Sequence, residues 1–557
     1  MGDPRRQAMA KRMLKVSTHA RRLAGEQGNQ DRVAHRLVVP PNSWRWRTRI
    51  FLAALDEPYG LGPAHTHLQR QGEGVLSVLV GHSFFLRFDA KQFERAKPYP
   101  PLATLQIAEL LRGQGHEVSL FDAMLASSTK DFDNMLERRR PQLVVLYEDN
   151  YNYLSKMCLA RMREAACSMI TSARRGGARV IVAGSDASDA PEPYLQAGAD
   201  AALRGEGLEA LNLLLRRLDT HPSLDHRALV EGIAQAVTQV DGRLLRGHAA
   251  TTISLPQPRA AEAAHLEAPA AWDLVEIERY RATWIAAHGS FSLNMAASKG
   301  CSFRCAWCAK PIWGQHYQQR SPAAVAAEMA DLKRRFAPDH IWFADDIFGF
   351  RADWVQRFAA ELKAHGGGVP FTIQTRADLV SDTMAQALSD AGCYEAWIGA
   401  ESGSQRVLDA MDKGTTVAEI LQARRRLRAA GVRVGFFIQL GYLGEGLDEL
   451  LQTRRLIEEA KPDDIGVSVS YPLPGTRFHE QVKTQLGGKT HWEDSADLAM
   501  MFQGSFGTDF YREVRDLLHA QVDLGRIDGR TWHRGHHELQ QRWTRLISGA
   551  SAAALTA

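Results

Sequence analysis

Apolar positions divide the chain into two series of alternating strands and helices. In the first series, five short apolar runs have the length and β-branched content of buried strands, and helix-periodic stretches lie between or after them. The runs are 75–80 (VLSVLV), 116–123 (HEVSLFDA), 141–150 (PQLVVLYEDN), 178–186 (ARVIVAGSD) and 199–207 (ADAALRGEG). This alternation predicts an α/β domain with a doubly wound, Rossmann-like parallel sheet.

The second series runs from about 290 to 476 and contains six strand–helix units. Its strands are expected near 292–298, 340–346, 370–376, 395–402, 432–442 and 464–475. A closed barrel of eight such units usually needs about 250 residues. We therefore predict a partial, open (β/α)6 TIM-like barrel.

The remaining segments complete the expected domain organisation. Residues 221–285 are rich in Pro and Ala and lack a clear period, which predicts a linker with a little added structure, and residues 481–557 are helical in pattern. The predicted order is a basic N-terminal extension (1–70), the first sheet domain (75–220), the linker (221–285), the partial barrel (286–480) and a helical C-terminal region (481–557).

Composition and charge narrow the class of protein. Of 557 residues, 45% are hydrophobic and 24% charged, and no apolar run reaches the roughly 18 residues that span a membrane. We expect a cytoplasmic protein without a membrane span. Residues 1–50 carry twelve Lys or Arg against three Asp or Glu, a net of +9, which leaves −5 for the rest of a chain whose net is +4. This basic leader either contacts nucleic acid or anionic lipid or is a frayed terminus; no specific nucleic-acid partner is expected.

Three of the six cysteines lie within eight positions in KGCSFRCAWC, after the first strand of the partial barrel: Cys301, Cys305 and Cys308. Loops at this end of barrel strands build active sites, so a metal or redox centre is expected. The other three are each expected to be small buried hydrophobes: Cys158, Cys167 and Cys393.

Four kinds of site compete for the three thiols. A structural zinc site needs a fourth Cys or His, and only His316 is near. A disulfide with a spare thiol does not suit an intracellular chain. A fully ligated electron-transfer cluster would need Cys393, which starts a later strand away from the loop. The fourth possibility is a cubane cluster held by three thiolates, whose fourth iron stays open for a substrate.

The CxxxCxxC spacing, the aromatic Trp307 before the last cysteine and the partial barrel together resemble the radical S-adenosylmethionine (SAM) enzymes. The resemblance implies a [4Fe-4S] cluster on Cys301, Cys305 and Cys308 that cleaves SAM to a 5′-deoxyadenosyl radical. It also implies that SAM contacts the loop and the strand ends, and the candidate SAM-binding residues are Trp307, Asp345, Asp346, Arg376, Glu401, Ser402, Gln439 and Gly441.

The first domain resembles the cobalamin-binding domain that precedes the barrel in one subclass of these enzymes. The resemblance implies that cobalamin contacts the strand ends and the KPYPPL segment; the candidates are Pro100, Pro101, Tyr147, Glu148, Asp149, Asn150, Gly184, Ser185, Arg204, Gly205 and Glu206. The DxHxxG loop that supplies a cobalt-ligating His elsewhere does not occur in the sequence, and His82 is the single candidate near the first strand. The absence of the DxHxxG loop argues against a His as the lower ligand of cobalt, and not against the binding of cobalamin.

The resemblance implies a cobalamin-dependent radical SAM enzyme, foremost a C-methyltransferase acting on an unactivated carbon of a small-molecule, lipid or natural-product substrate. Its expected partner is a low-potential electron donor, a flavodoxin or ferredoxin. Two alternatives remain: a cyclase or rearrangement enzyme with the same cofactors, similar to the anaerobic porphyrin-ring cyclases, and an iron–sulfur redox sensor or regulatory nucleic-acid-binding protein. A tRNA or ribosomal-protein methylthiotransferase would need a further cysteine trio and a C-terminal β-barrel.

Overall fold

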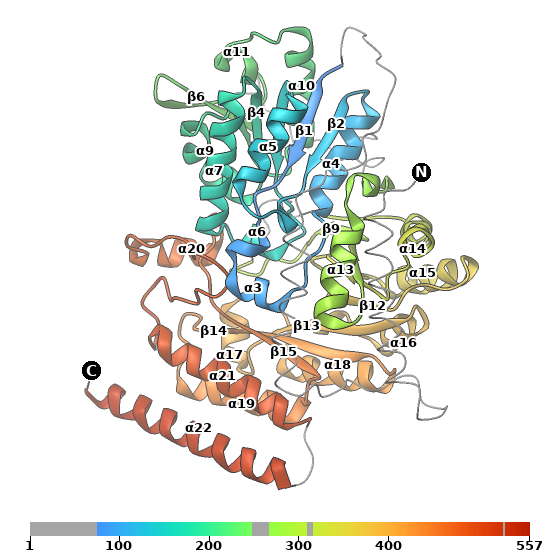
Figure 1. Cartoon of the computed structure of the whole chain (residues 1–557). Coiled ribbons are helices and arrows are strands. Elements are labelled where there is room, and N and C mark those ends of the chain that lie inside the picture. Colours follow the sequence, from blue (N-terminus) through green and yellow to red (C-terminus); the bar gives the residue numbers. More distant parts are fainter. Residues whose placement is uncertain (1–74, 248–266, 309–315, 527–529, 557) are drawn as a thin grey trace. The chain divides into compact units, whose positions relative to one another are not determined.

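The computed structural model describes residues 75–247, 267–308, 316–526 and 530–556, so the predicted basic extension (1–70) lies outside the described residues. The first sheet has seven strands in the order β2-β1-β3-β4-β5-β6-β7 (Figure 1). Its first five are mutually parallel and coincide with the five apolar runs of the sequence. In chain order they are β1 Ser77–Gly81, β2 Glu117–Phe121, β3 Leu143–Tyr147, β4 Arg179–Ala183 and β5 Ala201–Leu203.

Helices cover both faces of this sheet because its strands are apolar on both sides. Val78, Val80 and Val145 belong to a core cluster with residues of α4 and α10, whereas Leu79 and Val144 belong to another with residues of α5, α7 and α9. The 2-1-3-4-5 order places a topological switch point between β1 and β3, where ligands of doubly wound sheets bind. The helices are α3 Ala90–Arg95, α4 Leu102–Gly113, α5 Thr129–Arg139, α6 Tyr153–Lys156, α7 Ala160–Arg175, α8 Ser185–Asp189, α9 Glu192–Gln196, α10 Leu208–Thr220 and α11 His226–Val230.

The segment expected to be a linker extends the first sheet instead. After α11, strands β6 (Ala236–Val240) and β7 (Arg243–Arg246) pair antiparallel, and β6 pairs antiparallel with β5. Helix α13 (Ile277–His288) then leads into the second sheet. The first sheet unit therefore continues to at least Arg246, beyond the expected boundary at 220.

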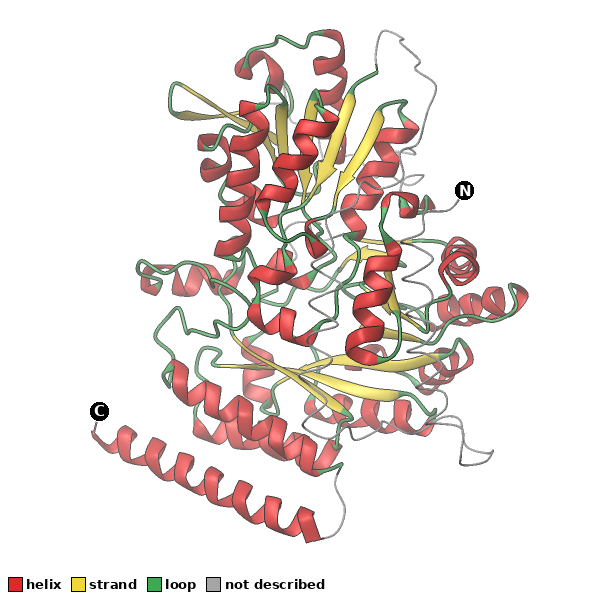
Figure 2. Ribbon diagram, viewed as in Figure 1, coloured by secondary structure: helices red, strands yellow, loops and turns green. Residues whose placement is uncertain are grey.

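The second sheet has six parallel strands in the order β15-β14-β13-β12-β11-β8, as predicted for an open partial barrel. Figure 2 draws the strands as yellow arrows and the helices in red. The strands are β8 Ser292–Met295, β11 His340–Phe343, β12 Phe371–Thr375, β13 Cys393–Glu401, β14 Arg433–Leu440 and β15 Asp464–Val469. The helices are α14 Pro322–Phe336, α15 Ala352–Ala364, α16 Asp382–Asp390, α17 Gln405–Ala410, α18 Val417–Ala429, α19 Leu447–Ala460 and α20 Arg477–Val482. A separate antiparallel pair, β9 (Ser298–Gly300) and β10 (Tyr317–Gln319), brackets the cysteine loop.

The C-terminal region is helical in part. Helix α21 (Thr508–Leu524) packs against the edge strand β15, and α22 (Arg530–Thr556) packs against α21. The stretch 486–507 between α20 and α21 has no helix and bonds to the first sheet unit, where Ser495 donates to Asp89. Within the described residues, no helix is long and apolar enough to cross a membrane.

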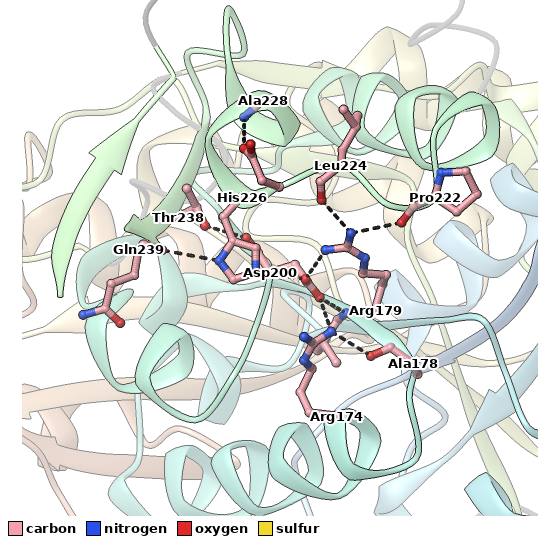
Figure 3. A network of polar contacts seen from close by, with 12 residues as sticks. Arg174, Ala178, Arg179, Asp200, Pro222, Leu224, His226, Ala228, Thr238 and Gln239 are labelled. Carbon is pink, nitrogen blue, oxygen red and sulfur yellow. Dashed lines mark hydrogen bonds and ion pairs between the residues drawn. The ribbon is translucent and has the colours of Figure 1, made fainter. Parts of the chain in front are cut away.

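A buried carboxylate ties the N-terminal ends of β4 and β5 to their helices. Asp200, fully buried, accepts hydrogen bonds from Arg174 (3.1 Å), Arg179 (2.6 Å) and the Val180 backbone (2.7 Å), and His226 Nε2 lies 3.2 Å away (Figure 3). Because this network lies away from the C-terminal strand ends, it is a structural feature of the sheet rather than part of a ligand site.

Candidate active site

The cysteine loop leaves β9 and is attached to two other elements. The Ala306 N–H donates to Met411 O beyond α17 (2.8 Å), and the Phe478 N–H at the start of α20 donates to Ala306 O (3.0 Å). Cys301 is buried, whereas Cys305 and Cys308 are half-buried and share one turn, in which the Cys308 N–H lies 3.5 Å from Cys305 O. Two of the three cysteines of the loop are therefore partly exposed, and one is buried.

The three thiols are not drawn together as a finished ligand set. Among the residues that the structure describes, which exclude 309–315 of this loop, no three Cys, His, Asp or Glu side chains lie close enough to hold a metal ion. Cys393 begins β13, at the opposite end of the strand from Glu401, as the sequence predicted.

Arg376, which follows β12, lies against the same loop. Its Nη1 points at Cys305 Sγ at 3.7 Å, and its guanidinium carbon lies 3.7 Å from the centroid of the Phe303 ring. Its other nitrogens donate to Asp378 (2.9 and 3.1 Å) and to Lys413 O (2.7 Å). The guanidinium is thus shared between the cysteine loop and the neighbouring strand end.

Glu401 ends β13 with a backbone φ of +59°, an uncommon value for a residue with a side chain. Its carboxylate accepts a hydrogen bond from Lys413 Nζ (2.7 Å), and both side chains are buried. A Cβ on Gly399 would lie 2.6 Å from both polar atoms, so a side chain at 399 would displace the pair. Burial lowers the pKa of Lys413, but Glu401 and Cys305 raise it by more.

Around this pair, two side chains keep polar atoms without partners. Lys413 Nζ lies 6.0 Å from the Trp307 ring centroid, and the Trp307 Nε1–H has no hydrogen-bond partner among the described residues. Ser402 is engaged, because its hydroxyl accepts from the Ser404 N–H (3.1 Å). At the end of β14, Gln439 Oε1 is buried and unpaired within the described part of the chain.

Gly441, just past β14, is held by a buried carboxyl group. Its φ is +73°, and its N–H donates to Glu445 Oε2 (2.5 Å). Burial raises the pKa of Glu445 to about 8. The sequence analysis missed Glu445, although it follows in the same LGYLGE segment.

The two aspartates after β11 have different environments. Asp345 is fully buried and accepts hydrogen bonds from the Ser298 hydroxyl (2.5 Å) and the Ala297 N–H (3.0 Å); burial raises its pKa to about 7. Asp346 is partly exposed and pairs with Lys156 Nζ (2.5 Å) on α6. Of the two predicted alternatives, Asp346 is the one that a ligand can reach.

The C-terminal edge of the first sheet carries a row of buried polar groups. Glu148 accepts from the Ser83 hydroxyl (2.6 Å), and Asp149 accepts from the Ala103 N–H (3.0 Å). Burial is the main cause that raises the pKa of both carboxyls, that of Asp149 to about 6. Asn150 is fully buried, and neither of its amide atoms has a partner among the residues described.

The neighbouring strand ends have the same character. Gly184 has a φ of +153°, and a Cβ there would lie 2.8 Å from Glu148, so the chain after β4 approaches β3 as closely as it does only because 184 is Gly. Ser185 Oγ is buried and unpaired in the described structure. Tyr147 donates to Glu206 O (2.8 Å), and the Gly205 N–H donates to Ser188 Oγ (3.0 Å).

The other residues predicted at this edge are either exposed or bonded through backbone atoms. Arg204 is exposed, and its N–H donates to Gln235 O (2.8 Å). Pro101 directly precedes α4, and Pro100 O accepts from the amide of Asn294 on β8 (2.9 Å).

His82 lies directly after β1 and is fully buried. Its Nε2 lies 3.0 Å from Asp122 Oδ1, whereas its Nδ1 has no partner within the described chain. Burial lowers its pKa, but Asp122 and the carboxyls of Glu148 and Asp149 raise it by more. The ring therefore faces the carboxyl groups of this edge rather than solvent.

Two ion pairs connect the edges of the two sheets. Lys156 on α6 pairs with Asp346, and Lys299 on β9 pairs with Glu206, in both cases through a lysine side chain that is 7% exposed. The sequence analysis missed both lysines because each pairing joins residues more than 90 positions apart. The candidate residues of the two domains thus form one continuous region.

Residues 295–457, from the end of β8 to α19, match the Radical SAM superfamily. The match covers the cysteine loop and most of the second sheet. Members of this superfamily use SAM and a [4Fe-4S] cluster.

Similarity to known proteins extends beyond these residues. The chain is 22% identical over 386 residues to an uncharacterized methyltransferase of Pyrococcus horikoshii, covering 68% of this chain and 78% of that one. It is 26% identical over 291 residues to the anaerobic magnesium-protoporphyrin IX monomethyl ester cyclase of Cereibacter sphaeroides, covering 52% of this chain and 45% of the cyclase.

A solved structure has the same fold. The radical SAM methyltransferase TsrM from Kitasatospora setae, with cobalamin and a [4Fe-4S] cluster bound, superposes with a TM-score of 0.61 at 17% identity, covering 74% of this chain and 76% of TsrM. At this identity the likeness shows a shared fold.

The donor groups of the barrel fit a cluster and SAM. Three thiols on one loop are the ligand type of iron–sulfur clusters, and buried cations at Arg376 and Lys413 complement their negative charge. Unpaired buried polar atoms on Gln439 and Trp307 can be satisfied by a polar ligand. The unpaired atoms of Asn150 and Ser185 and the close approach at Gly184 fit an amide-rich ligand at the first sheet in the same way.

Proposed function

We propose that this protein is a cobalamin-dependent radical SAM methyltransferase that acts on an unactivated carbon of a small molecule, lipid or natural product. The observation that carries the proposal is the pair of strand-end regions just described. Each holds buried polar atoms that have no hydrogen-bond partner within the described part of the chain, and the Lys156–Asp346 and Lys299–Glu206 ion pairs join the two. Two ligands and a substrate between them account for both regions.

In the barrel, we assign the cluster to Cys301, Cys305 and Cys308. The SAM-contacting set is the one predicted from the sequence, with Asp346 rather than Asp345 at the ammonium group, because Asp345 is fully buried and bonded to β9. The assigned SAM contacts are Trp307, Asp346, Arg376, Glu401, Ser402, Gln439 and Gly441.

In the first domain, which we now draw as 75–247, we assign cobalamin to the carboxyl ends of the strands and the turn before α4. The unpaired amide of Asn150 and hydroxyl of Ser185 would bond the corrin side chains. The assigned contacts are Pro100, Pro101, Tyr147, Glu148, Asp149, Asn150, Gly184, Ser185, Arg204, Gly205 and Glu206.

When bound, the cofactors would supply a 5′-deoxyadenosyl radical and a transferable methyl group. The chain's contribution is to hold the substrate between them, and we place it beside Tyr153 at the start of α6. The side chain of Tyr153 is 52% exposed, and it lies on the helix whose Lys156 pairs with Asp346 of the barrel.

A second candidate function is a cyclisation with the same cofactors and no methyl transfer, favoured by the identity with the porphyrin-ring cyclase. Either reaction requires a low-potential electron donor, and we propose a flavodoxin or ferredoxin.

Product analysis separates the two functions. The protein is reconstituted anaerobically with iron, sulfide and cobalamin, then reduced and incubated with methyl-deuterated SAM and candidate substrates. Methyl transfer predicts S-adenosylhomocysteine, 5′-deoxyadenosine and a deuterated methyl group in the product. Product with 5′-deoxyadenosine but no deuterium would support the cyclase. Iron and sulfide binding without 5′-deoxyadenosine would contradict both and favour a redox sensor.

A further inference from the structure

The guanidinium of Arg376 contacts the cysteine loop in two directions. Its face lies on the Phe303 ring, with the guanidinium carbon 3.7 Å from the ring centroid, and its edge directs Nη1 at Cys305 Sγ, 3.7 Å away. Phe303 and Cys305 are two residues apart, so one side chain fixes both the position of the loop and the environment of one thiol.

The remaining nitrogens hold the guanidinium rigidly. Nε and Nη2 donate to Asp378 (2.9 and 3.1 Å), and Nη2 also donates to Lys413 O (2.7 Å) and Thr415 Oγ1 (3.0 Å). Arg376 is only 4% exposed. Such a planar, multiply bonded fork cannot be reproduced by lysine, whose ammonium is a single point charge.

A fixed positive charge and a hydrogen bond at a ligand sulfur act on the electron that a cluster accepts. Reduction adds negative charge to the iron and sulfur atoms, and a nearby N–H donor stabilises that charge. Because Arg376 is buried and Cys305 is half-buried, solvent screens the interaction only in part. The guanidinium therefore stabilises the reduced form of the cluster more than the oxidised form.

We propose that Arg376 is a positioning residue of the cluster loop that raises the reduction potential of the cluster by donating to the Cys305 sulfur. The proposal rests on the proposed function only in so far as Cys301, Cys305 and Cys308 hold the cluster; it does not depend on cobalamin or on methyl transfer. This role is additional to the proposed contact of Arg376 with SAM, and it persists when SAM is absent.

The test is a redox titration of the full chain without SAM or substrate. Wild type, R376K and R376M are reconstituted anaerobically with iron and sulfide, their iron content is measured, and the reduced signal is followed by electron paramagnetic resonance against potential. We expect R376M to shift the oxidised-to-reduced ratio at a fixed potential about tenfold toward the oxidised form, or about 59 mV more negative for one electron. R376K, which keeps the charge without the fork, should lie between wild type and R376M.

Arg320 provides a matched control. It is 3% exposed in the same sheet region and donates to Ala296 O (3.0 Å) and Glu328 (2.5 Å), and no contact of its side chain with sulfur is found among the described residues. R320K should perturb packing as R376K does but leave the potential unchanged.

The outcomes separate this inference from the proposed function. An R376M cluster with full iron content and the wild-type potential would overturn the role of Arg376 and leave the cluster assignment standing. If R376M assembles no cluster, R376K decides: an unshifted potential overturns the proposal and a negative shift supports it. Wild-type protein that assembles no cluster would overturn both.

Discussion

Lys413 neutralises the buried carboxylate of Glu401. Removing the cation in K413M would leave an uncompensated buried charge, which typically costs about 3–5 kcal/mol. We expect K413M to lower the free energy of urea unfolding by that amount, and K413M/E401Q to recover much of the loss. As a control, K483M breaks the exposed pair with Glu480 and should leave stability nearly unchanged. Strictly additive effects of K413M and E401Q would contradict a coupled pair.

Asp345 should make stability depend on pH. Burial raises its pKa from 3.8 to about 7, so the folded protein keeps a proton that the unfolded chain has released. The contribution of Asp345 to the free energy of unfolding is therefore lost as pH rises from about 4 to about 7. Between pH 5 and 8 we expect wild type to lose about 2–3 kcal/mol relative to D345N, measured by urea unfolding at each pH. Parallel pH profiles for the two proteins would show that Asp345 does not titrate in this range.

At the residue scale, the sequence indicated where polar groups would gather but not their partners. Asp345 and Asp346 are adjacent, yet one bonds to β9 and the other to Lys156. Which one is buried depends on the direction of each side chain at the end of β11, which residue type does not encode. The sequence could not identify Lys413 as a site residue, because it lies in a polar segment after α17. Its side chain reaches Glu401 only in the folded chain.

At the element scale, the Asp200 network joins β4, β5, α7 and α11 (Figure 3). D200N removes the charge that Arg174 and Arg179 share, and hydrogen bonds between charged groups contribute about 1.5–3 kcal/mol each. Since both arginines are partly exposed and can rehydrate, we expect a total loss of about 2–3 kcal/mol in denaturant unfolding. D353N, in the exposed Arg351 pair, should leave stability nearly unchanged. A D200N loss as small as that of D353N would contradict a structural role for the network.

The apolar runs predicted eleven strands because buried parallel strands are apolar on both faces, and all eleven form. The pattern failed at two short strands without an unbroken apolar run. These strands are β6, with the sequence AVTQV, and β7, with the sequence RLLR. Likewise, 486–507 was expected to be helical with its neighbours, but its place against the first sheet unit is set by contacts such as Ser495 to Asp89, more than 400 positions away.

At the scale of the whole molecule, both sheets share one buried apolar cluster, which contains Leu105 of α4, Leu293 of β8 and Leu517 of α21. A continuous core favours cooperative loss of structure. We expect the unfolding transitions followed by far-ultraviolet circular dichroism and by tryptophan fluorescence to coincide in wild type. The variant K156M/K299M, which removes both ion pairs between the sheets, should unfold at lower denaturant. Two well-separated transitions in wild type would mean that the sheets unfold independently.

The central claim is that the cysteine trio holds a cluster with one iron open to SAM. The most direct measurement is the electron paramagnetic resonance spectrum of the anaerobically reconstituted and reduced protein, recorded before and after SAM is added. The account predicts a cluster signal whose shape changes when SAM binds, and its loss in C301S, C305S and C308S. A reduced cluster signal that SAM leaves unchanged would contradict three-thiolate ligation.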